Sequence, residues 1–159
     1  MSDLYERDFI GWTEQQARLL RQAAAAGSNL GLDWANLIEE VEGLGRSQYH
    51  ALASQIRRIM VHLLKLEFSP AADPRSGREE SIDDARAEVR SLLRNDPGLK
   101  PRLPGVIAQE WPDAVKQAGG ALRRYGEDPA GIAARQRAGA AYTPEQILGD
   151  WLPERPDLS

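Results

Sequence analysis

One apolar stripe dominates the middle of the chain and limits the folds that the chain can adopt. Its positions recur three or four residues apart for about nine turns, which is the spacing of one helix face. Asp33 precedes the stripe as a helix cap, and two prolines follow it. The pattern predicts one helix over residues 33–68, either straight or kinked at Gly43–Gly45, where the stripe turns polar. The stripe positions are Trp34, Ile38, Val41, Gly45, Gln48, Leu52, Ile56, Ile59, Leu63 and Leu66.

Helical spacing recurs on both sides of this segment. The amino-terminal segment reads as one bent helix or two short ones, with Thr13 and Gln16 as a capping box that restarts the second. Asp96-Pro97 is a cap followed by a proline that suits a first helical turn, and Thr143-Pro144 repeats this signal. The expected helical segments are residues 4–26, 33–68, 78–95 and 97–126, and prolines divide the last of these into a short helix, a bend and a longer helix. A loop is expected over 69–77, loop and some helix over 127–140, and a short helix after Thr143.

No stretch alternates with the period of a strand, so the fold class is all-α. We expect an irregular helical bundle built around the long central helix, with a short C-terminal helix docked on it. One helical domain is expected over residues 1–153, followed by a frayed tail over 154–159. The residues expected to pack its interior are Phe9, Trp12, Trp34, Ile38, Val41, Leu52, Ile56, Ile59, Leu63, Leu66, Trp111 and Trp151.

Composition excludes several kinds of chemistry. The 159 residues include no cysteine, which rules out disulfides, thiolate metal sites and a cysteine nucleophile. The net charge of −4 argues against a dedicated duplex-DNA binder. No secretory signal or membrane-spanning run is found, so a cytoplasmic protein without membrane contact is expected. No motif calls for a cofactor, and none is expected.

Three residues are the best candidates for a metal site, namely Glu39, Glu42 and His62, because carboxylates and histidines on helices form such sites in bundles. On one straight helix, however, Glu42 and His62 are about 30 Å apart, so a shared ion requires a dimer or a sharp break. Carboxylates paired with arginines and a hydrogen-bonded boundary histidine are the simpler interpretation. His50 falls opposite the stripe and is expected in solvent. The ridge of Arg86, Arg90 and Arg94 is interpreted as complementing the helix dipole, with an acidic ligand as the alternative.

Several blocks of the sequence occur together, in this order, in one known family. They include Tyr5–Phe9, Trp12–Ala17, His62–Lys65, Pro97–Leu103 and Tyr142–Leu148. The most specific block is Glu39-Glu40-Val41-Glu42-Gly43-Leu44-Gly45-Arg46-Ser47. On these blocks the chain resembles the bacterial domain-of-unknown-function family 29 over roughly residues 5–153. The resemblance implies a small all-helical bacterial protein, and it implies no activity.

The specific block coincides with the polar interruption of the stripe. A discrete site or structural polar cluster is therefore placed at Glu39, Glu42, Gly45, Arg46 and Ser47. Since no catalytic set is found, we expect a non-enzymatic interaction or oligomerisation module that forms a homo-oligomer or binds another bacterial protein. The alternative is a metal-binding bundle, with hydrolysis as one option, that uses Glu39, Glu42 and His62. A nucleic-acid-associated regulator ranks below both.

Overall fold

The computed structural model describes residues 3–71, 74–139 and 141–156, and within these ranges it contains helices and no strand. The expected all-α fold, with one long helix and a short C-terminal helix, is confirmed. The elements are α1 (Leu4–Arg7), α2 (Phe9–Ala25), α3 (Trp34–Phe68), α4 (Arg75–Asn95), the 3₁₀ helix η1 (Pro97–Arg102), α5 (Leu103–Arg124), α6 (Ala130–Arg137) and α7 (Pro144–Leu148).

The chain forms two compact units, each built from two stretches of sequence. The first unit comprises Met1–Leu52 and Leu92–Pro101, and the second comprises Ala53–Ser91 and Arg102–Ser159. Helix α3 therefore contributes its first half to the first unit and its second half to the second. A single domain over residues 1–153 stays a prediction. Residues 157–159 of the expected frayed tail lie outside the described part of the chain.

A break at Asp8 separates α1 from α2. The Asp8 backbone leaves the helical region at φ −152° and ψ 83°, and its Oδ1 accepts a hydrogen bond from the Gly11 amide at 3.0 Å. A carboxylate suits this position because the first turn of a helix leaves amides unpaired. The predicted restart at Thr13 is wrong. Thr13 lies inside α2, where its hydroxyl donates to the Ile10 carbonyl oxygen at 2.7 Å.

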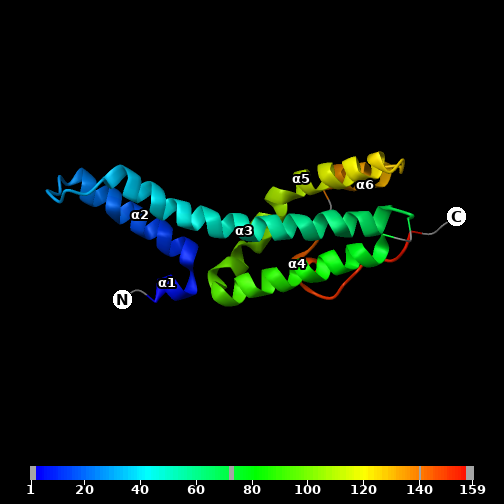
Figure 1. The fold of residues 1–159 in the computed structure, drawn as a ribbon, viewed down its shortest axis with the longest axis horizontal. Helices are drawn as coiled ribbons and strands as arrows, with labels where there is room; N and C mark the ends of the chain where they lie inside the picture. The colour runs from blue at the N-terminus through cyan, green and yellow to red at the C-terminus, as the bar shows by residue number, and fades with distance from the viewer. Residues whose placement is uncertain (1–2, 72–73, 140, 157–159) are drawn as a thin grey trace. The chain divides into compact units, whose positions relative to one another are not determined.

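In the first unit, α2 runs back alongside the first half of α3 (Figure 1). The side chains expected to form the packing stripe of α2 are displaced from its inner face. Phe9 and Trp12 are half-buried and form an aromatic cluster with Tyr5, while Leu19 is exposed. Small side chains at the inner positions let the helices approach closely, and an apolar pattern does not mark such positions. The buried residues of α2 are Ile10, Thr13 and Ala17.

Helix α3 starts directly after Asp33, whose Oδ1 accepts a hydrogen bond from the Asn36 amide at 3.3 Å. The helix continues without interruption through Gly43 and Gly45, so the predicted cap and span are confirmed. The stripe changes along the helix from half-buried to fully buried. Its half-buried members are Trp34, Ile38, Val41 and Gln48, and its buried side chains are Leu52, Ile56, Ile59, Leu63 and Leu66.

In the second unit, α4 lies along the second half of α3, and α5 packs against α6 (Figure 1). Helix α4 begins at Arg75, three residues before the predicted start, so Gly77 belongs to the helix and not to the predicted loop. Pro112 lies inside α5 without ending it. The buried apolar side chains from these helices include Ile82, Ala85, Val89, Val106, Ile107, Trp111, Val115, Leu122 and Ile132.

The C-terminal segment is held by a buried arginine of α4. Arg86 donates from Nε to the Ile147 carbonyl oxygen at 2.9 Å, and from Nη2 to those of Gln146 and Trp151 at 2.8 and 2.7 Å. Two of these carbonyl groups, those of Gln146 and Ile147, lie in the last turn of α7. The last carbonyl groups of a helix accept no hydrogen bond within the helix and carry the negative end of the helix dipole, so they suit a guanidinium. Trp151, predicted as a packing residue, is 38% exposed, because Arg86 holds its backbone and not its ring.

Candidate functional site

The acidic block of α3 is neutralised by arginines within the first unit. Glu42 forms an ion pair with Arg21 of α2, and Glu39 pairs with Arg46 at 2.6 Å. These side chains are partly or largely exposed, and exposed pairs contribute about 0–1 kcal/mol each. Ser47 is exposed as well. The Arg21–Glu42 pair links α2 to α3, whereas the Glu39–Arg46 pair lies within α3.

Gly45 is the member of the predicted polar cluster with a steric role. A Cβ atom at Gly45 would lie 2.3 Å from Thr13 Oγ1, which is far inside van der Waals contact. Thr13 of α2 therefore approaches the α3 backbone closely at Gly45. Both residues are buried, so the contact fixes where the two helices cross.

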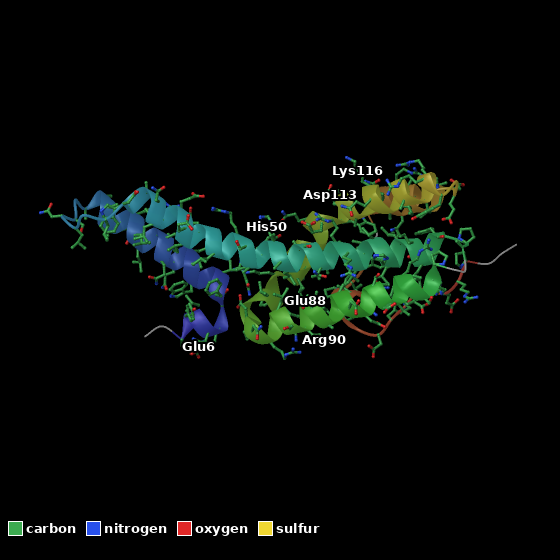
Figure 2. The ribbon with its side chains drawn as sticks, in the orientation of Figure 1. Glu6, His50, Glu88, Arg90, Asp113 and Lys116 are labelled. Carbon is green, nitrogen blue, oxygen red and sulfur yellow. The ribbon has the colours of Figure 1, made fainter. Side chains whose placement is uncertain are left out.

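The three metal candidates have separate surroundings. Glu39 and Glu42 lie in the first unit with their arginine partners, and His62 lies in the second unit. Within the described ranges of the chain, no group of three histidine, aspartate or glutamate side chains is placed to hold a metal ion. The metal site stays a prediction without geometric support. His50, the other histidine, is exposed on α3 as expected (Figure 2).

The second unit contains a hollow of about 610 Å³ at the ends of three helices. We call it the cationic hollow and define it by His62 and Lys65 of α3, Arg78 of α4, and Tyr125 and Glu127 after α5. The Arg78 side chain is 7% exposed and donates from Nη1 to the Lys65 carbonyl oxygen at 3.2 Å. Tyr125, at 72% exposed, lies at the rim. The hollow thus combines a buried guanidinium with an open edge.

Like charges determine the electrostatics of the cationic hollow. Burial lowers the pKa of Lys65, and the neighbouring charges of Arg78 and Arg124 lower it further. Burial likewise lowers the pKa of Arg78, against the opposing effect of Glu127. For His62, burial and then the charges of Lys65, Arg58 and Arg78 lower the pKa from 6.5 to about 4. The imidazole is therefore neutral at pH 7, and its buried Nδ1 has no hydrogen-bond partner in the described part of the chain.

The lowered pKa of His62 leads to a pH prediction. Between about pH 6.5 and pH 4 the unfolded chain binds a proton at His62 that the folded chain does not, so stability falls as the pH drops through this window. We expect the free energy of unfolding of His62→Gln to depend less on pH there than that of the original chain. Urea unfolding at several pH values measures this difference.

The chain has two histidines, so NMR can check the titration directly. In a His50→Gln variant, the remaining imidazole signals belong to His62. A His62 resonance that titrates near pH 6.5 would contradict the prediction.

The interpretation of the arginine ridge on α4 needs correction. Arg86 is buried among backbone carbonyls, whereas Arg90 and Arg94 are exposed, and Figure 2 labels Arg90 on α4. The three arginines therefore do not act as one surface. A sequence signal was present, because Arg78 and Arg86 share the helical register of the buried Ile82 and Val89.

A second polar network in this unit was not expected from the sequence. The Tyr142 hydroxyl donates to Glu67 Oε2 at 2.8 Å, and the same carboxylate pairs with Arg135. The Arg135 guanidinium also lies over the Tyr142 ring, 4.2 Å from its centroid. Burial and then Glu67 raise the pKa of Tyr142, so the hydroxyl stays protonated and donates. The network joins α3 to the segment before α7 and is structural.

The comparisons with known proteins place this geometry in a family. A family model described as a domain of unknown function, DUF29, matches residues 4–151. The chain belongs to the DUF29 family. The resemblance seen in the sequence is therefore confirmed, and the match includes residues from both stretches of each unit.

A solved structure supports the fold of this DUF29 chain. It is the crystal structure at 1.45 Å of an alpha-helical protein of unknown function from Rhodospirillum rubrum ATCC 11170. The two chains are 27% identical, the match covers 93% of this chain and 90% of the other, and the TM-score is 0.69. No curated protein matches the chain. Among the described helices, none has both the length and the apolar character that crossing a bilayer requires.

Proposed function

We propose that this DUF29 protein is a self-association module in which the α2–α3 hairpin of the first unit pairs with the hairpin of a second copy. The observation that carries the proposal is the burial along the hairpin. None of residues 18–44, all of which are described, is buried, although this stretch includes five exposed leucines. Exposed apolar side chains gathered on one hairpin suit a surface that a partner covers. The exposed leucines are Leu19, Leu30, Leu32, Leu37 and Leu44.

The change in burial along the apolar stripe of α3 also supports self-association. From Leu52 onward the stripe positions are 0–1% exposed, whereas Trp34, Ile38 and Val41 are half-buried. An isolated pair of helices cannot cover both faces of its apolar residues, and four-helix bundles solve this by adding a second pair. Leu37 and Leu44 are seven residues apart, so they lie on one helix face. That face is suited to a partner helix.

Polar side chains beside Leu44 favour an antiparallel second copy over an unrelated partner. Glu40, four residues before Leu44, and Ser47, three residues after it, lie on the same helix face and are exposed. If two α3 helices cross antiparallel at Leu44, the Glu40 carboxylate of one chain lies near the Ser47 hydroxyl of the other. A two-fold interface repeats this complementary contact on both sides of the axis. The pairing requires no residue outside this chain.

A charge at the centre of the proposed interface tests it. We expect a mass twice that of the 17.6-kDa chain at micromolar concentration, and a dissociation constant raised at least about tenfold by Leu44→Glu. The change acts twice, because a two-fold interface contains both copies of Leu44. Sedimentation equilibrium measures both quantities.

Tyr125→Glu provides the control, since Tyr125 is also exposed, more so than Leu44, but lies in the second unit. This variant should dimerise like the original chain. A single 17.6-kDa species at all concentrations would overturn the proposal, and so would a dimer that Leu44→Glu leaves unchanged.

A further inference from the structure

The cationic hollow of the second unit contains more positive charge than its own carboxylate balances. Lys65 and Arg78 make no ion pair with any described residue. Glu127 is the acidic residue among the described lining, and its buried Oε2 has no hydrogen-bond partner. Arg124 adds a further charge close enough to lower the pKa of Lys65. Unpaired cations that burial has partly desolvated are costly unless an anion joins them.

The donors of the hollow match a phosphate group. The Arg78 guanidinium has five N–H donors. Among the described residues its side chain donates to the Lys65 carbonyl oxygen from Nη1, which leaves most of these donors available. A planar guanidinium binds two oxygens of a phosphate in parallel, and an ammonium such as that of Lys65 adds a compact charge. A side chain that is 7% exposed, like Arg78, is also held in place before any ligand arrives.

The size and rim of the hollow indicate a ligand larger than free phosphate. Its volume of about 610 Å³ lies in the range of pockets that bind small organic molecules. Tyr125 presents its ring at the rim, where a flat organic group can stack on it. The lining of the hollow therefore combines charged donors with an aromatic ring.

We propose that the cationic hollow binds a small phosphomonoester, with Lys65 and Arg78 on the phosphate oxygens and Tyr125 against the organic part. This site is independent of the proposed self-association, because it lies wholly in the second unit. No reaction is attributed to it. The contact with Tyr125 gives the phosphomonoester a higher affinity than inorganic phosphate.

Titration with phenyl phosphate, at constant ionic strength and pH 7.5, tests the proposal on the full chain. Calorimetry should give saturable one-to-one binding that Lys65→Met weakens at least tenfold, because the variant keeps the apolar stem of the side chain and removes its charge. Tyr125→Ser should reduce the affinity for phenyl phosphate to that for inorganic phosphate. Lys65→Met and Tyr125→Ser alter residues that are not fully buried, so both should fold.

Two exposed lysines supply the controls. Lys100→Met, in the first unit, should leave the affinity unchanged. Lys116 of α5 lines a neighbouring hollow that shares Lys65 but not Arg78, so Lys116→Met should also have no effect (Figure 2). Absence of binding, binding insensitive to Lys65→Met, or a larger effect of Lys116→Met would each overturn the proposal. Equal affinity for phenyl phosphate and inorganic phosphate would overturn the role of Tyr125 and the assignment of an organic ligand.

Discussion

Replacing Arg86 by Met is expected to lower the free energy of unfolding by about 3–5 kcal/mol. The variant keeps much of the apolar volume but removes all the donors that hold the carbonyls of Gln146, Ile147 and Trp151. Each hydrogen bond to a charged group contributes about 1.5–3 kcal/mol, and a carbonyl left buried without a donor costs a similar amount. Urea unfolding at pH 7 measures the total loss.

The loss has an upper limit, because α7 can detach and let water bind the carbonyls. We therefore expect the amide of Ile147 to exchange with solvent much faster in Arg86→Met. Arg90→Met is the matched control on the same helix, since Arg90 is exposed, and it should change stability by no more than about 0.5 kcal/mol. Arg86→Lys should not restore the original stability, because one ammonium cannot reproduce the fork of donors. A loss below about 1 kcal/mol with unchanged exchange would contradict the role assigned to Arg86.

Adding one methyl group at Gly45 should also be costly. A Cβ atom there would lie 2.3 Å from Thr13 Oγ1, and overpacking of this kind costs about 1–3 kcal/mol. The higher helix propensity of alanine offsets about 1 kcal/mol of the cost. We expect Gly45→Ala to lower the free energy of unfolding by about 2 kcal/mol, because the buried, β-branched Thr13 has little room to rotate.

A double-mutant cycle identifies the cause. In a Thr13→Ala background the clashing hydroxyl is absent, so Gly45→Ala should become neutral or stabilising, with a coupling energy of about 2–3 kcal/mol. Gly43→Ala is the control, because a Cβ atom there would meet only the end of the Arg46 side chain, at 3.7 Å. Equal effects of Gly45→Ala in both backgrounds would show that the helices do not cross at this contact.

The parts of the fold that were predicted from the sequence have local causes. The cap at Asp33 and the capping box at Thr143 each involve residues three apart, and both form as expected. The long helix was predicted because its stripe repeats many times. In contrast, the sequence predicted that the second helix starts at Thr13, whereas the structure starts it after Asp8. Both residues have side chains that can cap a helix, and only tertiary packing determines which of them does so.

The candidate sites depend on contacts between distant segments, and sequence spacing does not report these. Arg86 binds backbone carbonyls about sixty residues away, and a carbonyl group has no sequence signature. The cationic hollow assembles residues from three segments, of which only His62 was considered in the sequence. The acidic block was predicted as a polar cluster, but Arg21, the partner of Glu42, lies on another helix.

The split construction of the first unit affects how the protein is made. Asp96 Oδ1 accepts hydrogen bonds from the Phe9 amide at 3.1 Å and from the Gly98 amide at 3.2 Å, so one carboxylate serves the start of α2 and the start of η1. On a ribosome, residues 53–91 are synthesised after the first stretch of this unit, which contains Phe9, and before the second stretch, which contains Asp96. At about 5–20 residues per second this takes several seconds, during which the emerging hairpin lacks its closing segment. The amino-terminal part of the nascent chain therefore cannot complete its folding in order of synthesis and must wait for residues 92–101.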